Sequence, residues 1–145
     1  MKISLKRLTE GELELIMHWR MREDISRYLI SSPELNIEGQ YKWFEKIKYD
    51  KTQIWWIIWT DDTPVGSMYL THIDYTHMRC YGPGWFLENK KLLNLKQLVS
   101  LQRNCYKFAF DVLGLNRLYG DVMAENEGVV QLVKLCGFEI EGTQK

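Results

Sequence analysis

The feature that most constrains this chain is a compact succession of helix and strand signals near its C-terminal end. An amphipathic helix pattern stops at Leu113-Gly114, and an apolar strand pattern follows from Leu118 to Val122. Asn126 is suited to cap a second helix, which is expected to end at Cys136-Gly137 and to lead into a short strand, Phe138–Glu141. Elements that alternate at this spacing bury their apolar faces by packing helices against one sheet, so the pattern favours an α/β domain.

The sequence before this run predicts further strands and helices. Strands are expected at Lys2–Leu8, Ile54–Trp59, Val65–Ile73 and Arg79–Leu87. Helices are expected after the capping box Thr9–Glu12, over Arg22–Leu29, from the cap Asn36 to about Tyr49, and over Asn94–Leu113. The order predicts a single α/β (α+β) domain over residues 1–145, with one mixed central sheet and helices on both faces.

One of these strands is interrupted by Gly82-Pro83-Gly84. Proline has no amide hydrogen to donate to a sheet ladder, so a bulge or a splayed strand is expected there.

Composition limits the function. The 19 basic and 19 acidic residues balance, which argues against a nucleic-acid binder that works through a broad basic face. The longest apolar run, Ile54–Trp59, is too short to cross a bilayer, and no N-terminal signal pattern is present, so a cytoplasmic protein without membrane contact is expected. The 3 cysteines have no metal-ligand spacing, and we expect reduced thiols and no metal site.

The C-terminal run resembles that of the GNAT-type N-acetyltransferases, in which a helix, a strand that follows Leu-Gly-Leu-Asn-Arg-Leu, and an Asn-capped helix ending in Gly-Phe occur in this order. The chain is most similar to the branch with ribosomal-protein N-terminal acetyltransferases and amino-sugar acetyltransferases of the pseudaminic acid pathway. The marks of that branch here are His18-Trp19-Arg20, Trp43-Phe44, Pro64-Val65-Gly66-Ser67 and Leu70–Asp74.

The resemblance implies that acetyl-coenzyme A is the acyl donor. Its pantetheine arm would lie along Trp85, Phe86 and Leu87 like an added strand. Its diphosphate would bind the helix N-terminus formed by Leu95, Lys96, Gln97 and Leu98, and Asn126 would contact the donor or only cap its own helix. The glycines usual in that loop are absent, and Asn94 with Gln97 instead forms a capping box that satisfies the amides a phosphate needs.

Two family groups that perform the chemistry are also replaced. A Tyr that protonates the departing thiolate aligns with Val133, and a Glu that deprotonates the amine aligns near Gly82. The candidate replacements are His72, which can accept a proton near neutral pH, and Glu125, which could act through water. Each has a structural alternative: a turn histidine bonded to backbone for His72, and a charge that complements a helix dipole for Glu125.

The expected function is therefore acetyl transfer to a primary amine, either an amino sugar on a nucleotide or a protein N-terminus. Trp19, Arg20 and Asp74 are the candidate acceptor contacts, although packing and surface ion pairing account equally well for Trp19 and Arg20. The alternative is a non-catalytic GNAT-fold module for ligand binding or dimerisation.

The resemblance also implies a further strand after Phe138–Glu141 that is missing from a chain ending at Lys145. An unpaired edge would then invite a second copy and form a homodimer, or the acceptor side of the cleft would be open.

Overall fold

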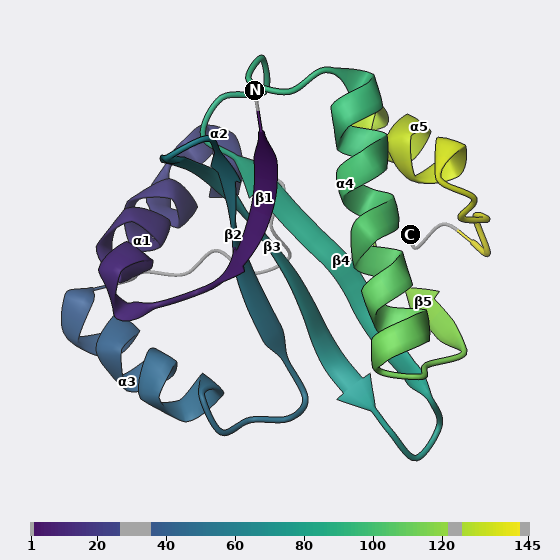
Figure 1. The fold of residues 1–145 in the computed structure, drawn as a ribbon, viewed down its shortest axis with the longest axis horizontal. Coiled ribbons are helices and arrows are strands. Elements are labelled where there is room, and N and C mark those ends of the chain that lie inside the picture. Colours follow the sequence, from purple (N-terminus) through teal and green to yellow (C-terminus); the bar gives the residue numbers. More distant parts are fainter. Residues whose placement is uncertain (1, 27–35, 122–125, 143–145) are drawn as a thin grey trace.

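The computed structural model describes residues 2–26, 36–121 and 126–142 as one layered α/β domain (Figure 1). Its strands are β1 (Ile3–Arg7), β2 (Ile54–Thr60), β3 (Thr63–Asp74), β4 (Arg79–Leu87) and β5 (Arg117–Tyr119). Its helices are α1 (Leu13–Met21), α2 (Glu23–Ser26), α3 (Ile37–Ile47), α4 (Leu95–Lys107) and α5 (Glu127–Leu135), with a 3-10 turn at Glu10–Glu12 and a π-helical turn at Phe108–Val112.

The sheet has the strand order β1-β2-β3-β4-β5, with antiparallel pairing up to β4 and a parallel β4–β5 pair. Helices α1 and α3 cover one face, and α4 covers the other with α5 beside it (Figure 1). The predicted mixed sheet with helices on both faces is therefore confirmed. Three of the predicted caps form their hydrogen bonds: Thr9 with Glu12 and Asn94 with Gln97 form capping boxes, and Asn36 accepts the Gly39 amide.

Two cores form because successive residues of a strand point to opposite faces. In β2, Trp56 and Ile58 pack against the α4 side, whereas Trp55 and Ile57 pack against α1 and α3. The apolar run Ile54–Trp59, which is too short to cross a membrane, thus forms an interior strand of the sheet with one core on each face.

The β4 and β5 strands pair over only three positions, from Arg79↔Arg117 to Tyr81↔Tyr119. Beyond Tyr81, β4 continues to Leu87 with β3 on one side and no described strand on the other. The pairing register also shifts between Tyr69 and Thr71 of β3. The splay expected at Gly82-Pro83-Gly84 is confirmed.

Two expectations for the C-terminal part need correction. The strand expected at Leu118–Val122 is Arg117–Tyr119, and Val122 lies outside the described residues. It stops early because the Asp121 amide donates to the Tyr81 hydroxyl, 3.1 Å away, and not to a strand backbone.

The strand expected at Phe138–Glu141 is wrong, since those residues are irregular. The Phe138 amide donates back to the Val133 carbonyl, and the Glu141 carboxylate accepts two hydrogen bonds from Arg117. These contacts tie the segment to α5 and β5 without a ladder, so the unpaired strand edge on which the homodimer was predicted is not formed.

The long helix expected over Asn94–Leu113 is present, but its last turn is wider than expected. The Leu113 amide donates to Phe108, five residues earlier, which is the π-helical spacing. The expected helix Arg22–Leu29 is described only as α2, and residues 27–29 lie outside the described part.

Candidate functional site

The open half of β4 is the first component of the site. Phe86 and Leu87 are buried and Trp85 is half-buried; Phe86 packs on the α1 and α3 side, whereas Trp85 and Leu87 pack on the α4 side. These side chains fix the strand, while no described strand pairs with its outer edge. An extended ligand can therefore add to that edge through backbone hydrogen bonds.

The N-terminus of α4 is the second component, and the capping box occupies part of it. The Asn94 Oδ1 accepts the Gln97 amide at 2.8 Å, and the Gln97 Oε1 accepts the Asn94 amide at 2.8 Å. No hydrogen bond described for the structure uses the amides of Leu95 and Lys96. The helix end thus keeps two amides and its dipole for an anion, but not the amide of Gln97. A diphosphate fits this end only in part.

The start of α5 differs in part from expectation. Asn126 is the N-cap residue of α5, as predicted, but its side chain makes no capping hydrogen bond, and its carbonyl accepts from Val130. Among the described residues, no hydrogen bond is recorded for its half-buried side chain. Glu125 lies outside the described residues.

No tyrosine stands on α5, where Val133 is half-buried. The nearby Tyr106 of α4 is committed elsewhere, since its hydroxyl donates to Gln102 Oε1 at 2.8 Å and its ring packs edge-on against Phe138. Burial raises the pKa of Tyr106 well above its usual range.

His72 lies at the end of β3, on the wall of an open cavity of ≈ 500 Å³. The cavity is lined by Thr52, Gln53, Thr71, His72, Ile73, Asp74, Arg79 and Tyr119. His72 has a φ of 52°, a left-handed conformation uncommon for a residue with a side chain. Its exposed ring lies edge-on to Tyr81, with 5.8 Å between centroids, and its Nδ1 is 3.3 Å from the Thr71 hydroxyl. The histidine thus stands beside the first residues of the splay.

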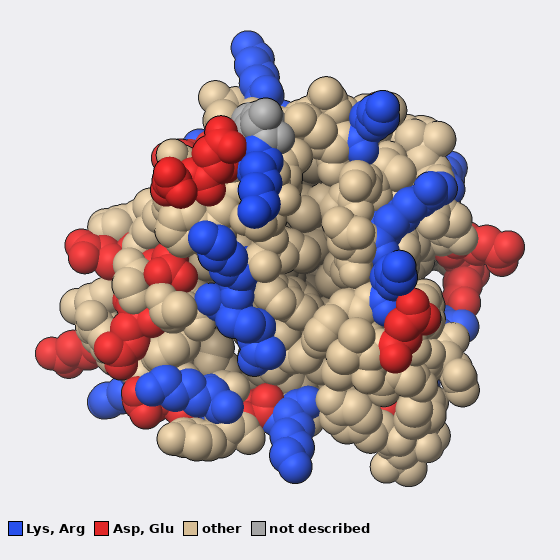
Figure 2. All heavy atoms as spheres, in the orientation of Figure 1, with Lys and Arg blue, Asp and Glu red and all other residues tan. Residues whose placement is uncertain are grey.

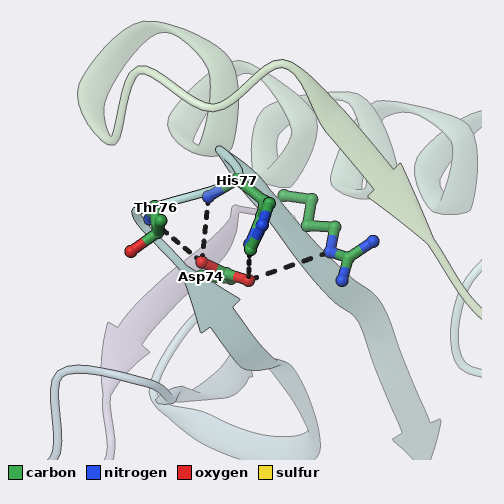
Figure 3. A network of polar contacts seen from close by, with 4 residues as sticks. Asp74, Thr76 and His77 are labelled. Atoms are coloured by element: carbon green, nitrogen blue, oxygen red, sulfur yellow. Dashed lines mark hydrogen bonds and ion pairs between the residues drawn. The ribbon is translucent and has the colours of Figure 1, made fainter.

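Asp74, in the same cavity, is held by the β3–β4 turn (Figure 3). Its Oδ1 accepts the amides of Thr76 and His77, and its Oδ2 lies 2.8 Å from His77 Nδ1 and 3.9 Å from Arg79 Nε. The hydrogen bonds from His77 hold the pKa of the Asp74 carboxyl below its usual value. The structure thus gives Asp74 a role in shaping the turn.

Trp19 and Arg20 lie on α1 and differ in environment. Trp19 is buried against Phe86, with ring centroids 6.2 Å apart, and its indole Nε1 has no hydrogen-bond partner among the described residues. The half-buried Arg20 guanidinium lies 5.6 Å from the centroid of Trp55. Burial lowers the pKa of Arg20, and no described carboxylate forms an ion pair with it.

Sequence reasoning missed two tyrosines. Tyr69 of β3 is stacked on Trp55, with centroids 4.1 Å apart, and it pairs in register with Gly84 of β4. Tyr81 bridges the mouth of the splay through its hydroxyl, which accepts the Asp121 amide and lies 3.4 Å from the Asp121 carboxylate. Strand alternation, which is readable in the sequence, agrees with the packing of Tyr69 on the side of α1 and α3. The position of Tyr81 depends on the irregular β3–β4 pairing, which the sequence does not specify.

Three further observations concern the charged side chains at the surface, the metal-binding groups and the length of the apolar helices. On the face shown in Figure 2, basic side chains follow β1 and α4, acidic side chains lie over α1, and both kinds lie over α3, so neutral net charge hides an uneven distribution. In the described part of the chain, no group of three or more His, Cys, Asp or Glu could hold a metal ion. None of the helices described there is long and apolar enough to cross a membrane.

The family model described as acetyltransferase (GNAT) domain matches residues 2–139. A comparison with curated protein sequences finds no match.

The solved structures that resemble this fold include spermidine N-acetyltransferases. One from Vibrio cholerae, in complex with CoA and spermine, has a TM-score of 0.86 and 21% sequence identity, covering 97% of this chain and 82% of that one. A dodecameric structure of the Vibrio cholerae enzyme has a TM-score of 0.81 and 19% identity, covering 97% and 81%. At these identities the similarity establishes the fold.

Proposed function

The chain belongs to the GNAT acetyltransferase family, and from that premise we propose that it transfers acetyl from acetyl-coenzyme A to a primary amine on an anionic acceptor. The observation that supports it most is the half of β4 beyond Tyr81, which pairs with β3 but with no described strand on its other edge, so a pantetheine arm can add there as a strand. Asn126, whose side chain forms no hydrogen bond with a described residue, would bind the same arm.

In the proposed reaction the amine attacks the thioester carbonyl directly and no covalent enzyme intermediate forms. A backbone amide of the open β4 segment stabilises the oxyanion. His72 takes the amine proton, since it is exposed, has no carboxylate partner among the described residues and stands next to Tyr81 at the splay. Glu125 is the alternative base.

The acceptor we propose is an amino sugar on a nucleotide, with a protein N-terminus as the alternative. Arg20 supports an acceptor that carries negative charge, because a half-buried guanidinium without a described carboxylate partner favours a ligand anion. The spermine bound by a structural neighbour is a polycation, and the same guanidinium would repel it. Trp19 would position Arg20 through the packing of α1 on Phe86.

The test is an acceptor panel. The purified protein is incubated with acetyl-coenzyme A and a nucleotide-linked amino sugar, a short peptide with a free N-terminus, or spermidine. Thiol release gives the rate, and the acceptor's mass shows whether one acetyl group was gained. We expect the nucleotide sugar to react fastest and Arg20→Gln to raise its KM without raising that of a neutral amine. Preference for spermidine would contradict the proposed acceptor.

A second candidate is a non-catalytic GNAT-fold module, and two observations favour it. The Asn94 capping box takes an amide that the diphosphate needs, and Val133 stands where the family acid would be. Binding of coenzyme A without turnover of any amine in the panel would support this candidate.

We also propose that the protein works in the cytoplasm, where acetyl-coenzyme A is made and thiols such as Cys80 and Cys105 are reduced. Self-association is a further proposal, supported by exposed apolar side chains such as Phe110 and Val112 and not by strand pairing at the C-terminal segment. Light scattering at micromolar concentration tests it, and a monomer mass would contradict it.

A further inference from the structure

Tyr69 is the residue whose placement the reaction described so far does not use. Its ring is stacked on Trp55 and leans across β4 above Gly84. A Cβ atom built on Gly84 would lie 2.8 Å from the Tyr69 hydroxyl oxygen and closer still to the ring. Glycine at position 84 is therefore what lets the ring cross the strand.

The direction of that crossing matters. Tyr69 comes from β3, on one side of β4, and the unpaired edge of β4 is on the other side. A ring that reaches over Gly84 thus brings its hydroxyl from the closed side of the strand toward the splay. No described residue accepts a hydrogen bond from this hydroxyl.

The electrostatic surroundings suit a proton donor. Burial raises the pKa of Tyr69, so the phenol stays protonated near neutral pH, and the charge of Arg20 acts in the opposite direction and lowers the cost of a transient phenolate. Arg20 and Tyr69 both contact the Trp55 ring system, the guanidinium at 5.6 Å and the stacked phenol ring at 4.1 Å from its centroid.

We propose that Tyr69 is the general acid for the departing coenzyme A sulfur, in place of the α5 position occupied by Val133. This inference rests on the proposed acetyl transfer. The amine nitrogen bonds to the thioester carbon, the carbon–sulfur bond breaks, and the Tyr69 hydroxyl proton passes to the sulfur as the thiol leaves. The phenolate regains a proton from water, and the proton lost by the amine goes to His72 and then to solvent.

The test uses Tyr69→Phe, which removes the hydroxyl and keeps the ring on Trp55. Tyr106→Phe is the matched control, since its hydroxyl bonds within α4 to Gln102. We expect kcat to fall by roughly 10²-fold in Tyr69→Phe, the lower end for general acid catalysis, with KM for acetyl-coenzyme A unchanged, and no change in the control.

A second readout does not depend on turnover. The thiol of bound coenzyme A is titrated by thiolate absorbance, and it should ionise at a higher pH in Tyr69→Phe than in the parent, because the variant lacks the donor that stabilises the thiolate. That shift would support a Tyr69 hydroxyl beside the coenzyme A sulfur even if the parent transfers no acetyl group. In that case the proposed acetyl transfer would be contradicted, but the position of the Tyr69 hydroxyl would not.

Three results would overturn the inference: an unchanged kcat in an active parent, an unchanged thiol titration, or a loss confined to coenzyme A affinity. An active parent with any of these leaves the proposed function standing.

Discussion

The capping box on α4 makes a quantitative prediction about donor binding. Asn94→Gly removes the side chain that accepts the Gln97 amide at 2.8 Å and frees that amide for the diphosphate. A hydrogen bond to a charged group contributes about 1.5–3 kcal/mol. Because each 1.4 kcal/mol corresponds to a tenfold change in affinity, coenzyme A should bind about 10- to 150-fold more tightly.

The cost to folding should be small. Glycine at an N-cap costs only a few tenths of a kcal/mol relative to asparagine. Adding Lys96→Gly, to let the phosphate approach the backbone, costs about 1 kcal/mol for a glycine inside a helix. The double variant should thus stay folded and bind at least as tightly as Asn94→Gly unless the Lys96 charge contributes to binding.

Isothermal titration with coenzyme A measures the effect, and S-acetylpantetheine, which lacks the diphosphate, is the ligand control whose affinity should not change. Asn36→Gly is the matched protein control, because Asn36 caps α3 in the same way by accepting the Gly39 amide at 2.7 Å. Equal tightening for both ligands, or a parent that already binds coenzyme A at low micromolar affinity, would refute the reasoning.

Three further variants test the site and its frame. His72→Asn introduces a residue that tolerates the left-handed backbone, and it should lower kcat by ~10²-fold or more. The control His77→Asn, in the Asp74 turn, should leave kcat nearly unchanged. Equal losses in the two variants would contradict His72 as the base. Gly84→Ala should destabilise the fold by about 1–3 kcal/mol, measured by denaturant unfolding, and Tyr69→Ala should suppress that loss, since the clash is with the Tyr69 ring; additive losses would contradict it. Hydrogen bonds from Thr52 and Gln53 lower the pKa of Asp50 to about 2. The Asp50 carboxylate therefore stabilises the fold at pH values above its unfolded pKa, and this stabilisation is lost as the pH falls toward 2. Asp50→Asn should reduce the dependence of the melting temperature on pH in that range, and an unchanged dependence would contradict this assignment.

Local sequence signals predicted most of the fold for identifiable reasons. Thr9 with Glu12 and Asn94 with Gln97 satisfy helix amides within one turn, so the residues themselves contain the whole interaction. Pro83 between two glycines predicted the splay in the same way, because a missing amide hydrogen is a property of one residue.

The failures come where a distant partner decides. The Phe138–Glu141 segment has residues typical of a strand, but a strand also needs a neighbouring strand to pair with. Arg117 of β5 binds the Glu141 side chain, and no backbone ladder forms between the two segments. The sequence position of Asn126 predicts a side-chain cap on α5. Its backbone has φ −86° and ψ 65°, and in this conformation the side chain makes no capping hydrogen bond. Tyr69 was missed because its importance depends on Gly84, which only the β3–β4 register places beneath it.

These observations separate two properties that the family usually combines. Donor binding is affected at the first turn of α4, where the Asn94 side chain accepts the Gln97 amide. That amide is then not free for the diphosphate of coenzyme A, a group remote from the thioester bond that breaks. The chemical positions are altered differently, since Val133 removes one proton donor while Gly84 makes room for another in Tyr69. Gly84 is needed for the packing of the Tyr69 ring in either case, so the hydroxyl of Tyr69, and not the glycine, distinguishes a transferase from an inert module. These two changes together favour a transferase that binds its donor weakly over an inert module. The Asn94→Gly variant tests the weak donor binding, and the Tyr69→Phe variant tests the chemistry independently.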